Sequence, residues 1–364
     1  MERKAIFSNF NWILFLSMTL LIVYGTMMIL STVISKDVSP LENKLFVGHL
    51  LNITIGMACF FIFSQLDYRF YFHLFIPILI IIIVLLALVP VLGYISHGAV
   101  RWIDLGFTSF QPSEITKILF ILFLAAFLIK YRFRLPRVIY FLGSILLTGI
   151  VMGLVFIQPD LGTSIVSVII WFGMYYFAGM SLGEFLIILL SSLLMLPGGW
   201  FLLKDYQKER ILVFLNPQHD PLGSGYAILQ SIIAIGSGQF MGLGWGRGTQ
   251  SKLQFLPERQ TDFIFATLSE EMGFVGIFIL IALFVILLMS LLQIIKNSED
   301  KYGKLVGVGV FCWFTFQILV NIGMNLGIMP ITGIPLPFIS YGGSSLLACM
   351  IALGIMQSVV KYGK

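Results

Sequence analysis

Long stretches without a charged residue limit what this chain can fold into. A helix needs about 20 predominantly apolar residues to cross the hydrocarbon core of a bilayer. The charge-free runs are 5–35, 45–66, 70–100, 118–129, 138–159, 161–183, 185–203, 272–295 and 305–360. The last run is long enough for two spans, and the run that begins at 118 is extended back to Ser113, directly after Pro112. The pattern therefore predicts an all-α integral membrane protein with about ten transmembrane helices.

The composition supports one membrane-embedded domain over residues 1–364. The chain is 59% hydrophobic and 11% charged, whereas a soluble domain carries roughly 25% charged residues. The polar surface is too small to cover a water-soluble globule. The net charge of +5 is modest and is typical of basic cytoplasmic loops rather than of a nucleic-acid partner.

Lysine and arginine positions predict the orientation, because short cytoplasmic loops of membrane proteins are enriched in these residues. With the N-terminus inside, the short inner segments hold Arg3, Lys4, Arg69, Lys130, Arg132, Arg134, Arg137, Lys296, Lys301, Lys304, Lys361 and Lys364. The short outer segments hold Lys36, Lys44, Arg101 and Lys117. We therefore expect a multi-pass protein with both termini in the cytoplasm. The segment 204–262 is then a large extracytoplasmic loop between spans seven and eight, and 225–237 within it reads as an interfacial helix.

A charged side chain at the end of a membrane span costs free energy, so we expect it to have a structural or functional role. Glu114 and Lys117 are three residues apart on one predicted helix, so they share a face and can pair. That pair either anchors the helix end or lines a polar cavity, together with Arg101 and Trp102. Asp160 follows Gln-Pro between two spans, where it either caps the next helix or contributes to the same cavity.

Asp262 is the strongest candidate for chemistry. It stands where the charged loop enters an apolar helix, in the segment that also holds Glu258. A carboxylate at this boundary can accept a proton from a sugar hydroxyl or help to hold a cation. The alternative is that Asp262 only caps the helix.

The segment 329–345 is rich in proline and glycine and carries Ser340 and Ser344. Irregular backbone at membrane depth is tolerated where it is buried in protein or lines a cavity. We expect a cavity here on the same face as Asp262, with an ordinary outer turn as the alternative.

Several motifs are absent from the sequence. No glycine-rich loop ends in Gly-Lys-Ser/Thr, which argues against ATP hydrolysis. The four histidines have no metal-ligand spacing; they are His49, His73, His97 and His219.

Taken together, the motifs resemble the SEDS family, the shape, elongation, division and sporulation proteins of the bacterial cell wall. They are RWIDLG (101–106), FQPSEITK (110–117), QPDLGTS (158–164), DPLGSGYAILQSIIAIGSG (220–238), FLPERQTDFIFA (255–266), EEMGFVG (270–276) and GIPLPFISYGGSS (333–345). The resemblance covers nearly the whole chain, and GTQSKLQFLPE (248–258) is similar to the RodA branch. Gln260 departs from the histidine that members often carry before Thr-Asp-Phe.

The resemblance implies a ten-helix peptidoglycan glycosyltransferase in the bacterial cytoplasmic membrane. Such a protein polymerises lipid II into glycan strands at the outer face, for cell elongation and rod shape. It implies a class B penicillin-binding protein and other elongation-complex membrane proteins as partners, besides membrane lipids, and a divalent cation, Mg²⁺ or Mn²⁺. It also marks Asp262 as the essential aspartate of the Thr-Asp-Phe motif.

The expected mechanism is a single displacement in which Asp262 accepts the proton of the acceptor hydroxyl. A cation, or a basic side chain, stabilises the leaving diphosphate. The candidate substrate-binding residues are Arg101, Trp102, Glu114, Lys117, Asp160, Arg210, Glu258, Ser340 and Ser344.

Two other functions remain open from the sequence. A flippase or transporter of the same lipid also needs polar residues inside a bundle. A non-catalytic scaffold of the cell-wall synthesis complex could use an outer polar patch for docking. The concentration of Glu114, Lys117, Asp160 and Asp262 at the outer ends of spans favours chemistry at that face.

Overall fold

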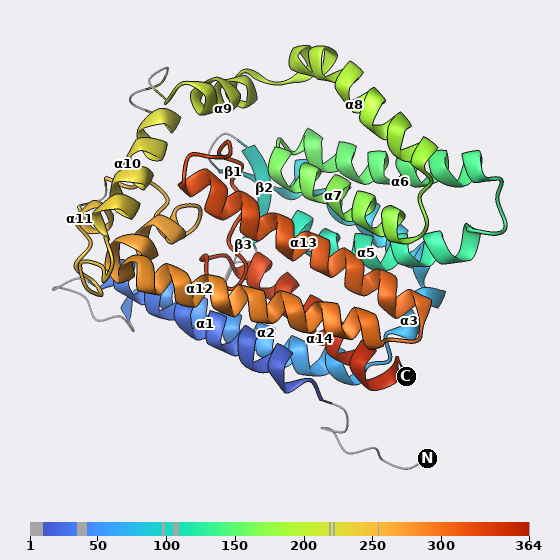
Figure 1. Ribbon diagram of the computed structural model, residues 1–364, viewed down its shortest axis with the longest axis horizontal. Coiled ribbons are helices and arrows are strands. Elements are labelled where there is room, and N and C mark those ends of the chain that lie inside the picture. The colour runs from blue at the N-terminus through green and yellow to red at the C-terminus, as the bar shows by residue number, and fades with distance from the viewer. Residues whose placement is uncertain are drawn as a thin grey trace.

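A computed structural model of the chain describes residues 10–34, 42–96, 99–104, 109–217, 220, 223–253 and 255–363. Several residues named above lie outside these ranges, and they are Arg3, Lys4, Lys36, His97, His219 and Lys364. The described chain is mostly helical (Figure 1). Its long helices run back and forth through one bundle, as the charge-free runs predicted.

The described part of the chain contains fourteen helices. They are α1 (Trp12–Val33), α2 (Lys44–Gln65), α3 (Arg69–His73), α4 (Phe75–Leu92), α5 (Pro112–Tyr131), α6 (Arg137–Ile157), α7 (Leu161–Phe177), α8 (Leu182–Leu202), α9 (Asp205–Leu215), α10 (Ser224–Ser237), α11 (Thr249–Lys252), α12 (Ile264–Asn297), α13 (Lys301–Asn325) and α14 (Gly343–Tyr362). Pro112 is the first residue of α5, a position where its missing N–H costs no helical hydrogen bond.

Eight of these helices are long and apolar enough to cross a membrane, within the part of the chain that the structure describes. They are α1, α2, α4, α5, α6, α12, α13 and α14. The apolar helix α7 has 17 residues, and the strongly apolar part of α8 runs over Leu182–Met195. The protein is therefore a multi-pass membrane protein, and a count of ten spans stays a prediction.

The bundle has two ends that are chemically different. Asn11 and Gly363, near the two termini, line one small depression and mark what we call the terminal end (Figure 1). Asp262 and the irregular segment between α13 and α14 lie at the opposite end, which we call the loop end.

Helix α5 is the most enclosed helix of the bundle. It packs against α4, α7, α13 and α14, and nearly all of its residues from Pro112 to Leu128 are buried. Phe120 and Phe123 on α5 and Trp313 and Phe314 on α13 are among the largest fully buried side chains. The large side chains of α5 and α13 therefore form part of a core that extends through the bundle.

A small sheet at the loop end was not predicted. The run 70–100 was expected to be one span, but α4 ends at Leu92 and the chain continues as strands. The strands β1 (Tyr94–Ser96), β2 (Ala99–Asp104) and β3 (Ser109–Phe110) form an antiparallel sheet in the order β1-β2-β3. Tyr, Ile, Val and Trp in this stretch favour strands, and the extended backbone of Gly93 ends the helix.

The segment 204–262 contains the short helices α9, α10 and α11, so the predicted helix over 225–237 is confirmed. α10 packs on α12. α12 is interrupted at Gly273, where the backbone has φ 62° and ψ −160°. The Gly-rich chain before α11 fits against this break, since the N–H groups of Leu243 and Gly244 donate to the carbonyls of Glu270 and Glu271.

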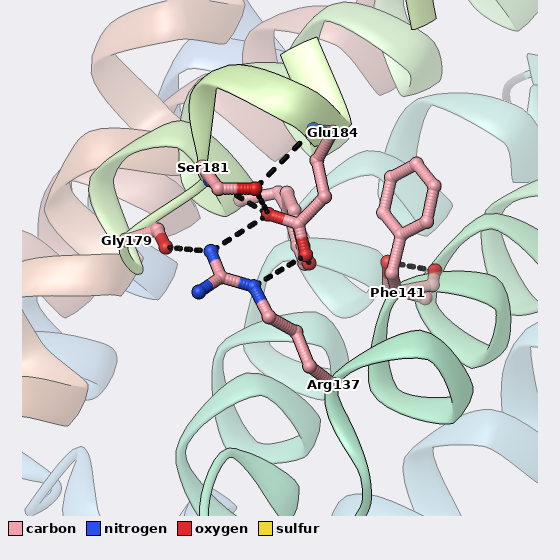
Figure 2. A network of polar contacts seen from close by, with 7 residues as sticks. Arg137, Phe141, Gly179, Ser181 and Glu184 are labelled. Carbon is pink, nitrogen blue, oxygen red and sulfur yellow. Dashed lines mark hydrogen bonds and ion pairs between the residues drawn. The ribbon is translucent and has the colours of Figure 1, made fainter. Parts of the chain in front are cut away.

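At the terminal end, a polar network joins α6, α7 and α8 (Figure 2). Arg137 donates from Nε to Glu184 Oε1 at 2.9 Å and from Nη2 to Glu184 Oε2 at 3.0 Å. The hydroxyl of Tyr175 donates to Glu184 Oε1 at 3.0 Å, and Glu184 completes a capping box with Ser181 at the start of α8. This network fixes the N-terminal end of α8. Further along the helix, the residues from Leu189 to Met195 are exposed on every face.

Candidate functional site

Asp262 lies at the loop end, immediately before α12, and its side chain is half-buried. The residue at the N-cap position of α12 is Phe263, so the alternative that Asp262 caps this helix is wrong. The backbone carbonyl of Asp262 accepts hydrogen bonds from the side-chain amides of Asn321 at 3.3 Å and Asn325 at 3.0 Å. The aspartate is thus held by its backbone at the boundary between loop and helix.

The irregular segment between α13 and α14, residues 326–342, packs against the loop that carries Asp262. Ser340 Oγ donates to the carbonyl of Thr261 at 2.6 Å, and the N–H of Tyr341 donates to the carbonyl of Gln260 at 2.8 Å. Ser340 Oγ also accepts from the N–H of Leu336 at 2.8 Å. The expectation that this segment shares a face with Asp262 is confirmed.

Gly333 faces the carboxylate of Asp262. A β-carbon built on Gly333 would lie 3.7 Å from Asp262 Oδ2, and the residue has φ 69°. A side chain at this position would be strained and would reduce the space beside the carboxylate. The absence of a side chain at Gly333 therefore leaves space beside the Asp262 carboxylate.

Two non-glycine residues near Asp262 have left-handed backbone. Glu258 has φ 44° and Phe338 has φ 64°. Such conformations cost about 1–3 kcal/mol each and concentrate at functional sites. The ring of Phe338 is buried edge-on against Phe314, with ring centroids 5.7 Å apart, so packing holds this conformation in place.

Glu258 is exposed beside an open cavity of about 270 Å³ that is lined by Leu256, Pro257, Glu258, Arg259 and Gln260. Thr261 Oγ1 donates to Glu258 Oε2 at 3.2 Å. The loop before α12 therefore presents a second carboxylate to solvent, close in sequence to Asp262.

A second polar cluster forms where β2, α5, α7 and α14 meet. Arg101 donates from Nη2 to the carbonyl of Pro159. The side chain of Gln111 donates to Asp160 Oδ2 at 3.2 Å, and the N–H of Gln111 donates to Ser344 Oγ at 2.8 Å. The structure thus brings together Arg101, Asp160 and Ser344, which are far apart in sequence.

Asp160 also caps α7, as predicted, because its Oδ1 accepts from the N–H of Thr163 at 3.1 Å. Its other carboxylate oxygen accepts from Ser113 Oγ at 3.4 Å besides Gln111. Capping and participation in the polar cluster are therefore both present in this one residue.

Glu114 and Lys117 form the predicted ion pair, with 2.8 Å between Lys117 Nζ and Glu114 Oε1. Both side chains are almost fully buried, and Lys117 Nζ lies 5.0 Å from the ring centre of Trp313. Glu114 Oε2 has no hydrogen-bond partner within the described part of the chain. Burying an ion pair in which one carboxylate oxygen has no hydrogen bond costs free energy of desolvation. We therefore expect the pair to have either a structural or a substrate-binding role.

The segment 326–342 connects the two clusters. On one side Gly333 faces Asp262, and on the other side Gly162, next to Asp160, touches the carbonyl of Thr332 so closely that a β-carbon would lie 2.8 Å from it. The Asp262 cluster and the Asp160 cluster are therefore two sides of one polar region at the loop end.

Two candidate residues are less directly placed in this region. Arg210 lies on α9, whose main packing partner is α10 (Figure 1). Trp102 is half-buried on β2, where its backbone pairs with Tyr94.

Sequence reasoning missed three residues that contact the site. Asn321 and Asn325 hold the backbone of Asp262, and the ring of His49 lies 6.1 Å from the ring of Tyr341, measured between centroids. A signal was present in the sequence, because two asparagines four residues apart in an otherwise apolar span need polar partners.

Asp262 and Glu258 are the carboxylates before α12 that would hold a divalent cation shared with a substrate. Among the described residues, no group of three or more His, Cys, Asp and Glu side chains could hold a metal. Mg²⁺ commonly uses one or two carboxylates and completes its shell with phosphate oxygens and water. The half-buried Asp262 and the exposed Glu258 fit that mode better than a closed protein cage.

Comparisons with known proteins agree with this arrangement. The family model of FtsW, RodA and SpoVE, described as cell cycle protein, matches residues 11–364. The peptidoglycan glycosyltransferase MrdB of Escherichia coli K12 is 41% identical over 94% of this chain and 91% of its own length.

Two solved structures share the fold. A chain from a peptidoglycan synthase complex that coordinates polymerization and crosslinking superposes with a TM-score of 0.81 at 31% identity, over 98% of this chain and 99% of that chain. The rod shape determining protein RodA of Thermus thermophilus, solved as an aspartate-to-alanine mutant, superposes with a TM-score of 0.73 at 28% identity, over 97% and 98%.

Proposed function

The chain belongs to the FtsW, RodA and SpoVE family, and from this premise we propose how its loop end carries out glycan synthesis. The protein is a RodA-like peptidoglycan glycosyltransferase of the cell wall. Our proposal is that it polymerises lipid II during cell elongation and that Asp262 is its catalytic base. The observation that carries the proposal is the half-buried carboxylate of Asp262, which faces Gly333, a residue without a side chain. The backbone carbonyl of Asp262 is held by hydrogen bonds from the side-chain amides of Asn321 and Asn325.

The reaction joins two lipid-linked sugars. The hydroxyl oxygen of the acceptor attacks the anomeric carbon of the donor, and the bond from that carbon to the polyprenyl diphosphate breaks. Asp262 takes the proton of the attacking hydroxyl, which typically contributes about 10²–10⁴-fold to the rate. The electron pair of the broken bond leaves with the diphosphate.

The leaving diphosphate needs positive charge nearby. Arg101 fits this role, because it is half-buried at the loop end and its Nε has no hydrogen-bond partner within the described residues. Lys117 is enclosed and already paired with Glu114, so a phosphate would reach it only after the surrounding side chains move. Mg²⁺ or Mn²⁺, if held by Asp262, would neutralise negative charge on the diphosphate. Arg210 is a further candidate on the side of α9.

The orientation that this function requires has support in the distribution of charge. Many basic residues of the described chain gather at the terminal end, and they include Lys130, Arg137, Lys296, Lys301 and Lys361 in the first or last turns of their helices. By the positive-inside rule this end faces the cytoplasm of the bacterial cell, with both termini. Ten spans, with α7 and α8 included, then place Asp262 at the outer face, where lipid II is consumed.

Helix α8 indicates the side from which lipid enters. Its residues from Leu189 to Met195 are exposed on every face, so hydrocarbon rather than protein surrounds this helix in a bilayer. Polyprenyl chains can therefore lie beside α8 while their diphosphates reach the loop end.

A class B penicillin-binding protein is the partner that fits best, since a chain of similar fold is part of a complex that couples polymerization to crosslinking. Other membrane proteins of the elongation complex are further candidates.

Purified protein supplied with lipid II and Mg²⁺ or Mn²⁺ tests the role of Asp262. Wild-type protein should produce glycan ladders, and Asp262→Asn should produce almost none while it remains folded. Asp205→Asn, an exposed carboxylate on α9, is the matched control and should keep wild-type activity. Substantial polymer from Asp262→Asn would remove the base from the mechanism.

A further inference from the structure

Asn321 and Asn325 are two fully buried carboxamides on one face of α13, one helical turn apart. Burying an amide without partners costs roughly 1–3 kcal/mol on the scale of protein mutations. Both amides have hydrogen-bond partners among the backbone groups of other segments, and those groups lie at the loop end.

The amide nitrogens of both residues converge on one carbonyl. Asn325 Nδ2 donates to the carbonyl of Asp262 at 3.0 Å, and Asn321 Nδ2 donates to the same carbonyl at 3.3 Å. Asn321 Nδ2 also donates to the carbonyl of Ile334 at 2.8 Å. Asn321 therefore ties the backbone of Asp262 to the segment that contains Gly333.

The amide oxygen of Asn325 caps α12 from a neighbouring helix. It accepts from the N–H of Ala266 at 3.2 Å, in the first turn of α12, and from Ser231 Oγ at 3.3 Å. The first N–H groups of a helix have no partner within the helix, and Phe263 at the N-cap position has no side chain that can accept. Asn325 thus fixes both sides of the junction, the carbonyl of Asp262 and the first turn of α12.

We propose that Asn321 and Asn325 are positioning residues for the catalytic base. They do not touch the reacting atoms, and they set the direction of the Asp262 carboxylate by immobilising the backbone from Asp262 to Ala266 against Ile334. This inference rests on the proposed role of Asp262 as base. Catalytic groups must be held within about 0.5 Å of productive geometry, and a displacement of about 1 Å can lower a rate by about 10²-fold.

The test compares Asn321→Leu and Asn325→Leu with Gln317→Leu. Leucine has the branched outline of asparagine, although it is larger, and it removes the hydrogen bonds of the amide. Gln317 is the matched control, because it lies one turn before Asn321 on α13, is fully buried, and has neither amide atom hydrogen-bonded within the described chain. Initial rates of glycan synthesis are measured against lipid II concentration, per amount of folded protein.

The expected result is a fall in kcat of about 10–100-fold in both asparagine variants, with KM nearly unchanged, because the lost interaction acts through the transition state. Gln317→Leu should keep kcat within about twofold, since it removes no bond to the site. Hydrogen exchange at the amide of Ala266 should become faster in Asn325→Leu and stay unchanged in Gln317→Leu.

Wild-type kcat in folded Asn321→Leu and Asn325→Leu would overturn the inference, as would an equal loss in Gln317→Leu. If the leucine variants do not fold, the smaller changes Asn321→Ser and Asn325→Ser are judged by the same criteria. Asp262→Asn, measured in parallel, separates the two proposals. Activity in that variant refutes the base itself, whereas an inactive Asp262→Asn beside fully active asparagine variants refutes only the positioning role.

Discussion

Removing one partner of the Glu114–Lys117 pair should destabilise the protein much more than removing both. The two side chains are 2.8 Å apart and almost fully buried, and Glu114 Oε2 has no further partner in the described chain. Loss of one partner from such a pair typically costs about 3–5 kcal/mol, because the remaining charge stays in a medium of low polarity. Replacing both with neutral side chains of similar size is often neutral or stabilising.

A double-mutant cycle of Lys117→Met, Glu114→Gln and the variant with both changes tests this expectation. We expect each single variant to lose about 3 kcal/mol or more of unfolding free energy in detergent, and the double variant to recover to within about 1 kcal/mol of wild type. The assay is reversible unfolding followed by the fluorescence of the six tryptophans, which include Trp313 beside Lys117.

The same variants separate the two explanations that the sequence leaves open for this pair. If the pair is only structural, the stable double variant polymerises lipid II at the wild-type rate. If it binds substrate, the double variant is stable and inactive. Single variants that lose less than about 1 kcal/mol, as exposed pairs do, would refute the reasoning from burial.

Further predictions concern other parts of the loop end and the terminal end. Gly333→Ala should lower glycan synthesis with little loss of fold, because its left-handed backbone costs an L-residue about 1–2 kcal/mol and its methyl group would point at Asp262; unchanged initial rates would contradict this. Ser340→Ala should loosen the contact between the two loops at a cost of about 1–3 kcal/mol, visible as faster hydrogen exchange at the N–H of Leu336. Removal of divalent cations with a chelator should abolish synthesis without lowering thermal stability, and addition of Mg²⁺ or Mn²⁺ should restore it; a large drop in melting temperature would instead indicate a closed structural site. Arg137→Gln should weaken the attachment of α8 to the terminal end while folded protein retains its specific activity, measured on the same lipid II substrate.

Local rules explain which features the sequence could predict. The pairing of Glu114 with Lys117 follows from their spacing on one helix, and the capping by Asp160 follows from its place before an apolar run. The start of α5 at Pro112 follows from proline's fixed backbone. Each of these depends on residues within a few positions of one another.

Contacts between distant segments could not be predicted in the same way. Asn325 meets Asp262 across 63 residues, and Asp262 is held by this partner rather than acting as the cap of α12. The sheet after α4 was missed because a run of apolar residues fits a long helix and a strand equally well. Charge-free runs indicate where the long helices lie along the chain, but they do not give the neighbours of each helix.

Polymerisation and lipid transfer measured in one preparation test the central claim most directly. Purified protein in liposomes, alone and with a class B penicillin-binding protein, is supplied with lipid II, and both glycan length and movement of lipid II across the bilayer are followed. An enzyme with Asp262 as base produces glycan chains in at least one of these conditions, and Asp262→Asn produces none. Transfer of lipid II across the bilayer without any polymer, from folded protein bound to its partner, would contradict the account and identify the chain as a flippase.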